Sequence, residues 1–87
     1  MINIDELKKK IIYRSNYRGT KEMDKLLGAF TKRYINKLSD DDLLKLEKLL
    51  SIDDSNLYNF LNGLETDVAI QENNVTDLFK SFEYIEN

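Results

Sequence analysis

Residues 13–24 read Tyr13-Arg14-Ser15-Asn16-Tyr17-Arg18-Gly19-Thr20-Lys21-Glu22-Met23-Asp24. One amphipathic helical pattern stops in this stretch and a second one starts. Gly19 permits a sharp reversal of the backbone, and Thr20 is a residue type that caps helix N-termini. The stretch therefore predicts a corner between two helices. Arg18 and Glu22 are expected to be displayed outward at this corner.

Helical spacing of apolar residues continues on both sides of the corner. The stripe before it consists of Ile4, Leu7, Ile11 and Ile12. This stripe predicts a helix over about residues 4–15, capped by Asn3 or Asp5. The stripe after it runs from Met23 to Leu38 and predicts a second helix. Gly28 lies inside that helix, where glycine is unfavourable, and so predicts a close approach of two backbones.

Three more helices are predicted in the second half of the chain. Ser39 is a candidate cap for the third, with Asp42 at the third position as in a capping box. A fourth begins near Asp54 or Ser55 and ends at Asn62-Gly63, where Gly63 fits a left-handed C-terminal cap. Residues 65–74 are acidic and weakly periodic, which predicts a loop. The last helix is expected over about 75–86, after an Asn74 cap.

The composition bounds both the fold and the chemistry. With 87 residues and no proline, the chain predicts a single all-α domain over 1–87. We expect a compact bundle of about five helices with short loops, a core over about 4–64 and a loosely attached last helix. The sequence has no cysteine and no histidine. It therefore cannot form disulfides, thiolate metal sites or serine–histidine catalytic pairs.

Two acidic runs invite a metal-binding interpretation. Asp40–Asp42 and Asp53-Asp54 each precede a predicted helix. Neither run has the spaced ligands of an EF-hand loop. Helix capping explains both runs better, and we predict no metal site.

Charge divides unevenly along the chain. Residues 1–37 contain ten basic and four acidic residues, whereas residues 38–87 contain three basic and twelve acidic ones. The split either attracts an acidic partner or phosphates, or lets the two halves attract each other. A basic-faced nucleic-acid-binding bundle is thus one alternative function, although the net charge of −3 opposes it. A generic adaptor for an unrelated protein is another.

The sequence contains no targeting or membrane-spanning pattern. No apolar run approaches the roughly 18 to 20 residues of a membrane span. The acidic start lacks the basic and apolar regions of a secretory signal and is unlike an Arg-rich presequence. We predict a monomer in the bacterial cytoplasm without membrane insertion. A mature form in the mitochondrial matrix is the second option.

Two motifs in register carry a resemblance. The first reads Arg18-Gly19-x-x-Glu22-Met23-Asp24, followed by Phe30, and the second reads Asp54-x-x-Leu57-Tyr58-x-Phe60-Leu61-x-Gly63. Over about residues 8–63 their order and spacing resemble the succinate dehydrogenase assembly factor family, small proteins that promote flavinylation. Three positions depart from the family pattern. Tyr17 replaces a frequent second arginine, Met23 a leucine, and Phe60 a tryptophan.

The resemblance implies a function and a site. It implies an assembly factor, not an enzyme, that binds the flavoprotein subunit of succinate dehydrogenase, with fumarate reductase as a second candidate client. The factor would promote covalent attachment of FAD to a histidine of the client and bind no cofactor itself. The partner-binding residues implied are Arg18, Gly19, Glu22, Asp24, Arg14 and Tyr17.

These residues are assigned different tasks. Arg18 and Glu22 would contact the client near its flavin site, and Gly19 would permit the close approach. Asp24 and Arg14 would support the corner, and Tyr17 would pack on the client. Tyr13 and Tyr58 are expected in the core or at its rim. On pattern alone, Arg18 and Glu22 could equally form an ion pair that only stabilises the turn.

Overall fold

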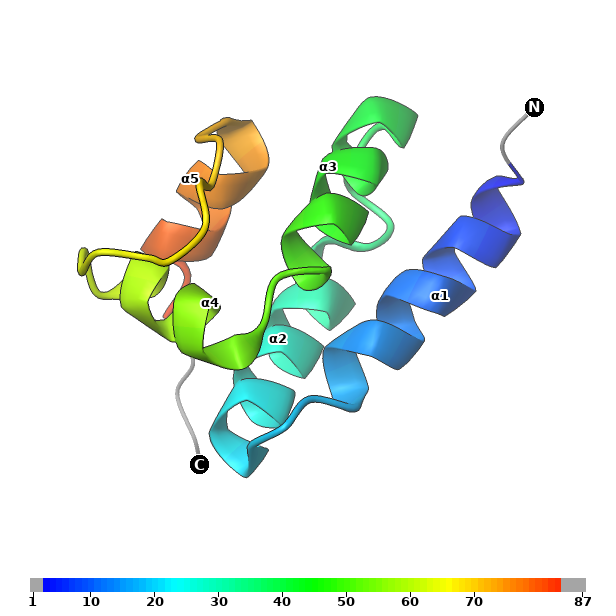
Figure 1. Cartoon of the computed structure of the whole chain (residues 1–87). Coiled ribbons are helices and arrows are strands. Elements are labelled where there is room, and N and C mark those ends of the chain that lie inside the picture. The colour runs from blue at the N-terminus through cyan, green and yellow to red at the C-terminus, as the bar shows by residue number, and fades with distance from the viewer. Residues whose placement is uncertain (1–2, 84–87) are drawn as a thin grey trace.

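The computed structural model describes residues 3–83, and these residues form an all-α bundle (Figure 1). Its helices are α1 (Ile4–Asn16), α2 (Lys21–Tyr34), α3 (Asp40–Leu50), α4 (Asp54–Leu61) and α5 (Asn74–Ser81). The predicted fold class and the order of the helices are confirmed. Residues 84–86 of the predicted last helix lie outside the described residues. Within the described part, no helix is long and apolar enough to cross a membrane.

Local capping residues set the start of each helix. Asn3 accepts a hydrogen bond from the Glu6 N–H, and Thr20 accepts one from the Met23 N–H, both at 3.2 Å. Ser39 accepts one from the Asp42 N–H at 3.2 Å. Each bond satisfies a backbone donor that the first helical turn leaves without a partner. These three predicted caps are confirmed.

The cap of α5 is Asn73, so the prediction of Asn74 was wrong by one residue. The Asn73 side chain accepts hydrogen bonds from the N–H groups of Val75 and Thr76, and the Thr76 hydroxyl accepts one from the Asn73 N–H. This reciprocal arrangement is a capping box. Both asparagines are good caps, and the hydroxyl three residues after Asn73 decides between them.

A single hydrophobic core takes residues from all five helices. Leu27 and Phe30 of α2 are fully buried within it. Helix α1 packs against α2 and α3, and α3 packs against α5. Figure 1 shows α1 and α5 on opposite sides of the central pair formed by α2 and α3.

Helix α5 belongs to this core, which corrects the expectation that it is loosely attached and that the core ends near residue 64. Val75 and Phe79 have no exposed surface. The Phe79 ring meets the Phe30 ring edge-on, with centroids 5.6 Å apart. Edge-to-face aromatic contacts of this kind add to the free energy of burial.

Glycine occupies positions 63 and 28 for different structural reasons. Gly63 has a φ of 71°, which confirms the left-handed cap predicted after α4. At Gly28 the predicted close approach of two backbones is not observed. A Cβ there would lie 2.7 Å from the Asn16 Oδ1, so the close neighbour is a side chain of α1.

We predict that Phe79→Ala lowers the free energy of unfolding by about 3 to 5 kcal/mol, because it removes a large buried ring and leaves a cavity. That loss is comparable to the whole stability expected of so small a domain. Guanidinium denaturation followed by circular dichroism measures it. Asp77→Asn, on the exposed side of the same helix, is the control. A loss below about 1 kcal/mol for Phe79→Ala would show that α5 is dispensable for the fold.

Candidate functional site at the corner between α1 and α2

The chain leaves the helical path at Tyr17 and re-enters it after the Thr20 cap. The interruption predicted between the two helices is confirmed. Gly19 does not adopt a positive φ at this corner. Gly63 is the one residue in the described range 3–83 that does so. The reversal therefore does not depend on left-handed backbone.

The Arg18 side chain points into the protein. Its Nε donates to the Asp54 Oδ1 at 2.7 Å. Its Nη1 donates to the Leu50 carbonyl at 2.6 Å, and its Nη2 to the Ile52 carbonyl at 2.5 Å. The side chain is only 9% exposed. The prediction that this guanidinium is displayed outward was wrong.

The end of α3 explains why an arginine lies here. The last carbonyls of a helix have no partner within the helix and carry partial negative charge. The planar fork of Arg18 reaches the Leu50 and Ile52 carbonyls and the Asp54 carboxylate together. A lysine ammonium has neither the fork nor the fixed spacing of donors. Arg18 therefore fixes the linker between α3 and α4.

Two carboxylates hold the backbone of the corner. The Asp54 Oδ2 accepts a hydrogen bond from the Gly19 N–H at 2.7 Å, so both oxygens of Asp54 are engaged. The Asp24 Oδ1 accepts one from the Arg18 N–H. A Cβ on Gly19 would lie 3.3 Å from the Asp54 Oδ2, which is tighter than most such contacts. Glycine thus allows Asp54 to approach the corner closely.

Glu22 differs from Arg18 in its exposure. It lies in the first turn of α2, where its charge suits the helix dipole, and its side chain is exposed. The carboxylate that pairs with the Arg18 guanidinium is that of Asp54, at 2.7 Å. The alternative of an Arg18–Glu22 ion pair within the turn was therefore wrong.

Exposed tyrosines flank the corner. Tyr17 is 71% exposed and Tyr13 is 64% exposed, and their ring centroids lie 4.6 Å apart. Tyr58 is 55% exposed and lies one turn after Asp54 on the same side of α4. Tyr13 and Tyr58 are therefore not core residues. Arg14 is half-buried in the last turn of α1, and its predicted supporting role stays a prediction.

Asp54 is the functional residue that sequence reasoning missed. It was placed at the start of a helix and in the second motif, but not at the corner, which it closes from 36 residues away. Its neighbour Asp53 is the N-cap of α4, as the capping interpretation predicted. Hydrogen bonds from Asn56 lower the pKa of the Asp53 carboxyl below its ordinary value.

Residues 3–83 contain no group of three or more His, Cys, Asp or Glu that could hold a metal ion.

Sequence comparisons with known proteins find relatives of this chain. The family model described as "Flavinator of succinate dehydrogenase" matches residues 9–83. The chain is 38% identical over 58 residues to the mitochondrial succinate dehydrogenase assembly factor 2 of Dictyostelium discoideum, covering 67% of this chain and 41% of the relative. It is 27% identical over 81 residues to the factor of the same name in Danio rerio, covering 91% and 51%.

A bacterial relative is similar over much of the chain. It is the FAD assembly factor SdhE of Acetobacter pasteurianus, 30% identical over 61 residues, covering 70% of this chain and 56% of the relative. No solved structure matches significantly. The chain spans about 40 to 50% of the length of the mitochondrial relatives described above. Because the family model matches most of the chain, the protein belongs to the family of flavinators of succinate dehydrogenase.

Proposed function

We propose that this protein is an assembly factor that binds the flavoprotein subunit of succinate dehydrogenase and promotes covalent attachment of FAD to it. Fumarate reductase is a second candidate client. Membership of the flavinator family supports the proposal. The observation that carries it is the corner itself, where the buried Arg18–Asp54 pair lies beside an exposed glutamate and exposed tyrosines.

The corner divides its work between inward and outward side chains. The Nε, Nη1 and Nη2 groups of Arg18 all donate hydrogen bonds within the protein. We therefore infer that Arg18 is a positioning residue. Glu22 and Tyr17 are exposed and are the groups that we assign to the client. Exposed tyrosines such as Tyr17 are typical of the residues that dominate binding energy at interfaces.

The chain acts on its client and supplies no catalytic group in this proposal. It has no histidine to which a flavin could be attached, and no Gly-rich strand–turn–helix motif for a dinucleotide. FAD is thus assigned to the client. A rigid corner can hold client elements so that the flavin and the client histidine meet in reactive geometry. Such positioning can accelerate a reaction greatly.

Ion pairs between the basic half and the acidic half of the chain disfavour nucleic-acid binding. Lys10 of the basic half pairs with Glu47 at 3.0 Å, and Arg18 pairs with Asp54 at 2.7 Å. Both cations belong to the basic half, which a nucleic-acid-binding bundle would use to contact phosphates, and both pair with the acidic half. Its relatives include mitochondrial proteins and one from a bacterium. The bacterial cytoplasm stays our prediction for this chain.

Deleting the gene should abolish or strongly reduce covalent flavin fluorescence on the denatured flavoprotein subunit. The reason is that, without the factor, flavin and client histidine are not held together. Total flavoprotein, measured by immunoblot, controls for client abundance, and expression of the wild-type factor should restore the signal. Unchanged flavinylation in the deletion strain would contradict the proposal.

Arg18→Lys should lower the free energy of unfolding by about 2 to 3 kcal/mol, because a single ammonium cannot replace the bonds to Asp54, Leu50 and Ile52. Chemical denaturation measures the loss. Arg33→Lys, at an exposed position of α2, is the matched control. The double variant Arg18→Lys with Asp54→Asn should be less destabilised than the sum of the single variants. Additive losses would argue against the clamp.

Glu22→Ala should weaken client binding at least about tenfold, a change of about 1.4 kcal/mol, while the melting temperature changes little. A pull-down titration with purified flavoprotein subunit measures the affinity. Glu6→Ala removes an exposed glutamate from the first turn of α1 and serves as control. Equal affinities for the two variants would place the client contact elsewhere.

A further inference from the structure

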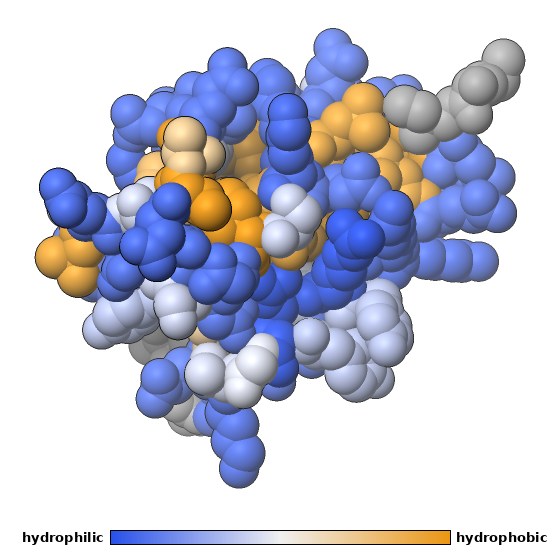
Figure 2. Space-filling model, viewed as in Figure 1, coloured by the Kyte–Doolittle hydropathy of each residue, from blue (hydrophilic) through white to orange (hydrophobic). Residues whose placement is uncertain are grey.

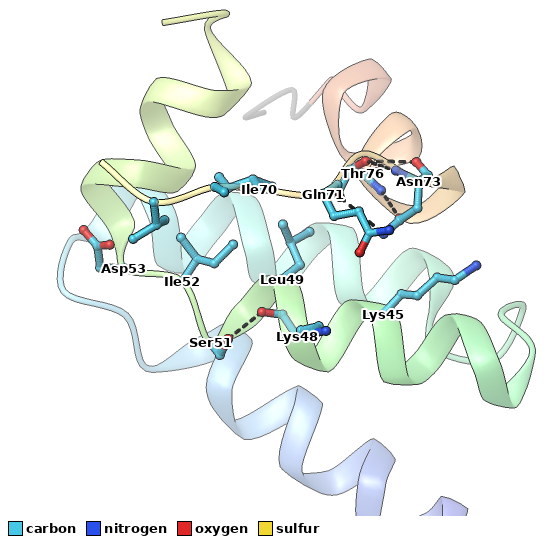
Figure 3. Close-up of a pocket in the computed structure, with 12 residues that line it drawn as sticks. Lys45, Lys48, Leu49, Ser51, Ile52, Asp53, Ile70, Gln71, Asn73 and Thr76 are labelled. Atoms are coloured by element: carbon cyan, nitrogen blue, oxygen red, sulfur yellow. Dashed lines mark hydrogen bonds between the residues drawn. The ribbon is translucent and has the colours of Figure 1, made fainter. Parts of the chain in front are cut away.

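A groove lies between α3 and the loop that leads to α5. Its cavity measures about 650 Å³. Apolar side chains of Leu49, Ile52, Ile70 and Val68 line it (Figure 3). Figure 2 shows apolar surface between α3 and this loop, surrounded by hydrophilic residues. Val68 is 45% exposed there.

The loop that forms one wall of the groove has backbone N–H groups that make no hydrogen bond within the described residues. Residues 69–73 have no helical or strand assignment, and Ala69 and Gln71 are exposed. Within residues 3–83, the N–H groups of Ala69, Ile70 and Gln71 donate to no other protein group. The loop is nevertheless attached to the fold, because the Asp67 N–H donates to the buried Asn56 side chain at 2.7 Å. Unpaired backbone beside an apolar groove is where an extended peptide can add as a strand.

The charge at the rim selects the peptide. Lys45 is engaged with Asp42 at 3.3 Å and with Asn74 at 2.8 Å, and Asp53 is engaged with Asn56. Lys48 is exposed and lines the groove, and its ammonium forms no ion pair with any residue of the described range. The two lysines that line the groove outnumber its one carboxylate, that of Asp53, so the lining carries net positive charge. It complements an acidic side chain on the bound peptide.

We propose that this groove binds an extended, acidic segment of a partner protein, in which apolar and acidic side chains alternate. Successive side chains of an extended strand point to opposite sides, so one set meets Leu49, Ile52 and Ile70 while the other meets Lys48 and solvent. This binding site goes beyond the proposed flavinylation function and does not depend on it.

The test is titration of the whole isotope-labelled protein with an acetylated six-residue peptide that alternates valine and glutamate, followed by amide NMR. We expect saturable shifts at Ala69, Ile70 and Gln71, and little effect from a peptide that alternates valine and lysine. Lys48→Glu should weaken binding about three- to tenfold, because it removes an exposed charge contact and places a negative charge beside the acidic peptide. Val68→Ser should weaken it as well.

Both substituted side chains are exposed, so the variants should stay folded, and their amide spectra verify this. Lys9→Glu, an exposed lysine on α1, is the matched control and should leave the affinity unchanged. Shifts confined to the corner, equal binding of the lysine peptide, or no shift at millimolar peptide would each overturn the proposal. These results would leave the flavinylation test unaffected, because that test follows the client.

Discussion

The ion pair between Arg18 and Asp54 is the constraint on which the corner depends. A charge at this depth is unfavourable unless it is paired and its remaining donors are satisfied. Here the Arg18 Nε, Nη1 and Nη2 and both Asp54 oxygens are engaged. The pair therefore joins α1, α2, the end of α3 and the start of α4 at one place. The exposed side chains of Glu22 and Tyr17 lie beside this buried contact.

Much of the fold follows from local sequence. Where the structure differs from the prediction, the cause is either a neighbouring residue or packing between distant helices. Capping residues and apolar stripes predicted the helices, because a cap acts within three residues and a stripe within one helix. The start of α5 was misplaced because Asn73 and Asn74 both suit a cap and the Thr76 hydroxyl decides. The contact partner of Phe79 was not predictable from its own helix, because Phe30 lies 49 residues earlier in the chain and meets it only in the assembled core.

The candidate site was predictable in position but not in orientation. Gly19 and the Thr20 cap located the corner correctly. Local spacing cannot show where a long side chain points, and the partner of Arg18 lies 36 residues away. Two short motifs, one ending near Asp24 and one beginning at Asp54, stood in the sequence as separate signals. The fold makes them one unit, since the first motif's arginine binds the second motif's aspartate. Gly19 is explained by the same contact, because its N–H donates to that aspartate.

The reach of Asp54 has a consequence for biosynthesis. The carboxylate that fixes the Gly19 N–H belongs to a segment made after α1, α2 and α3. A nascent chain that ends before α4 lacks it, and its corner residues are not yet fixed. Closing so long a loop has an entropic cost that only the later helices offset. The corner is therefore completed late, and a fragment that lacks α4 does not present its side chains in their final arrangement.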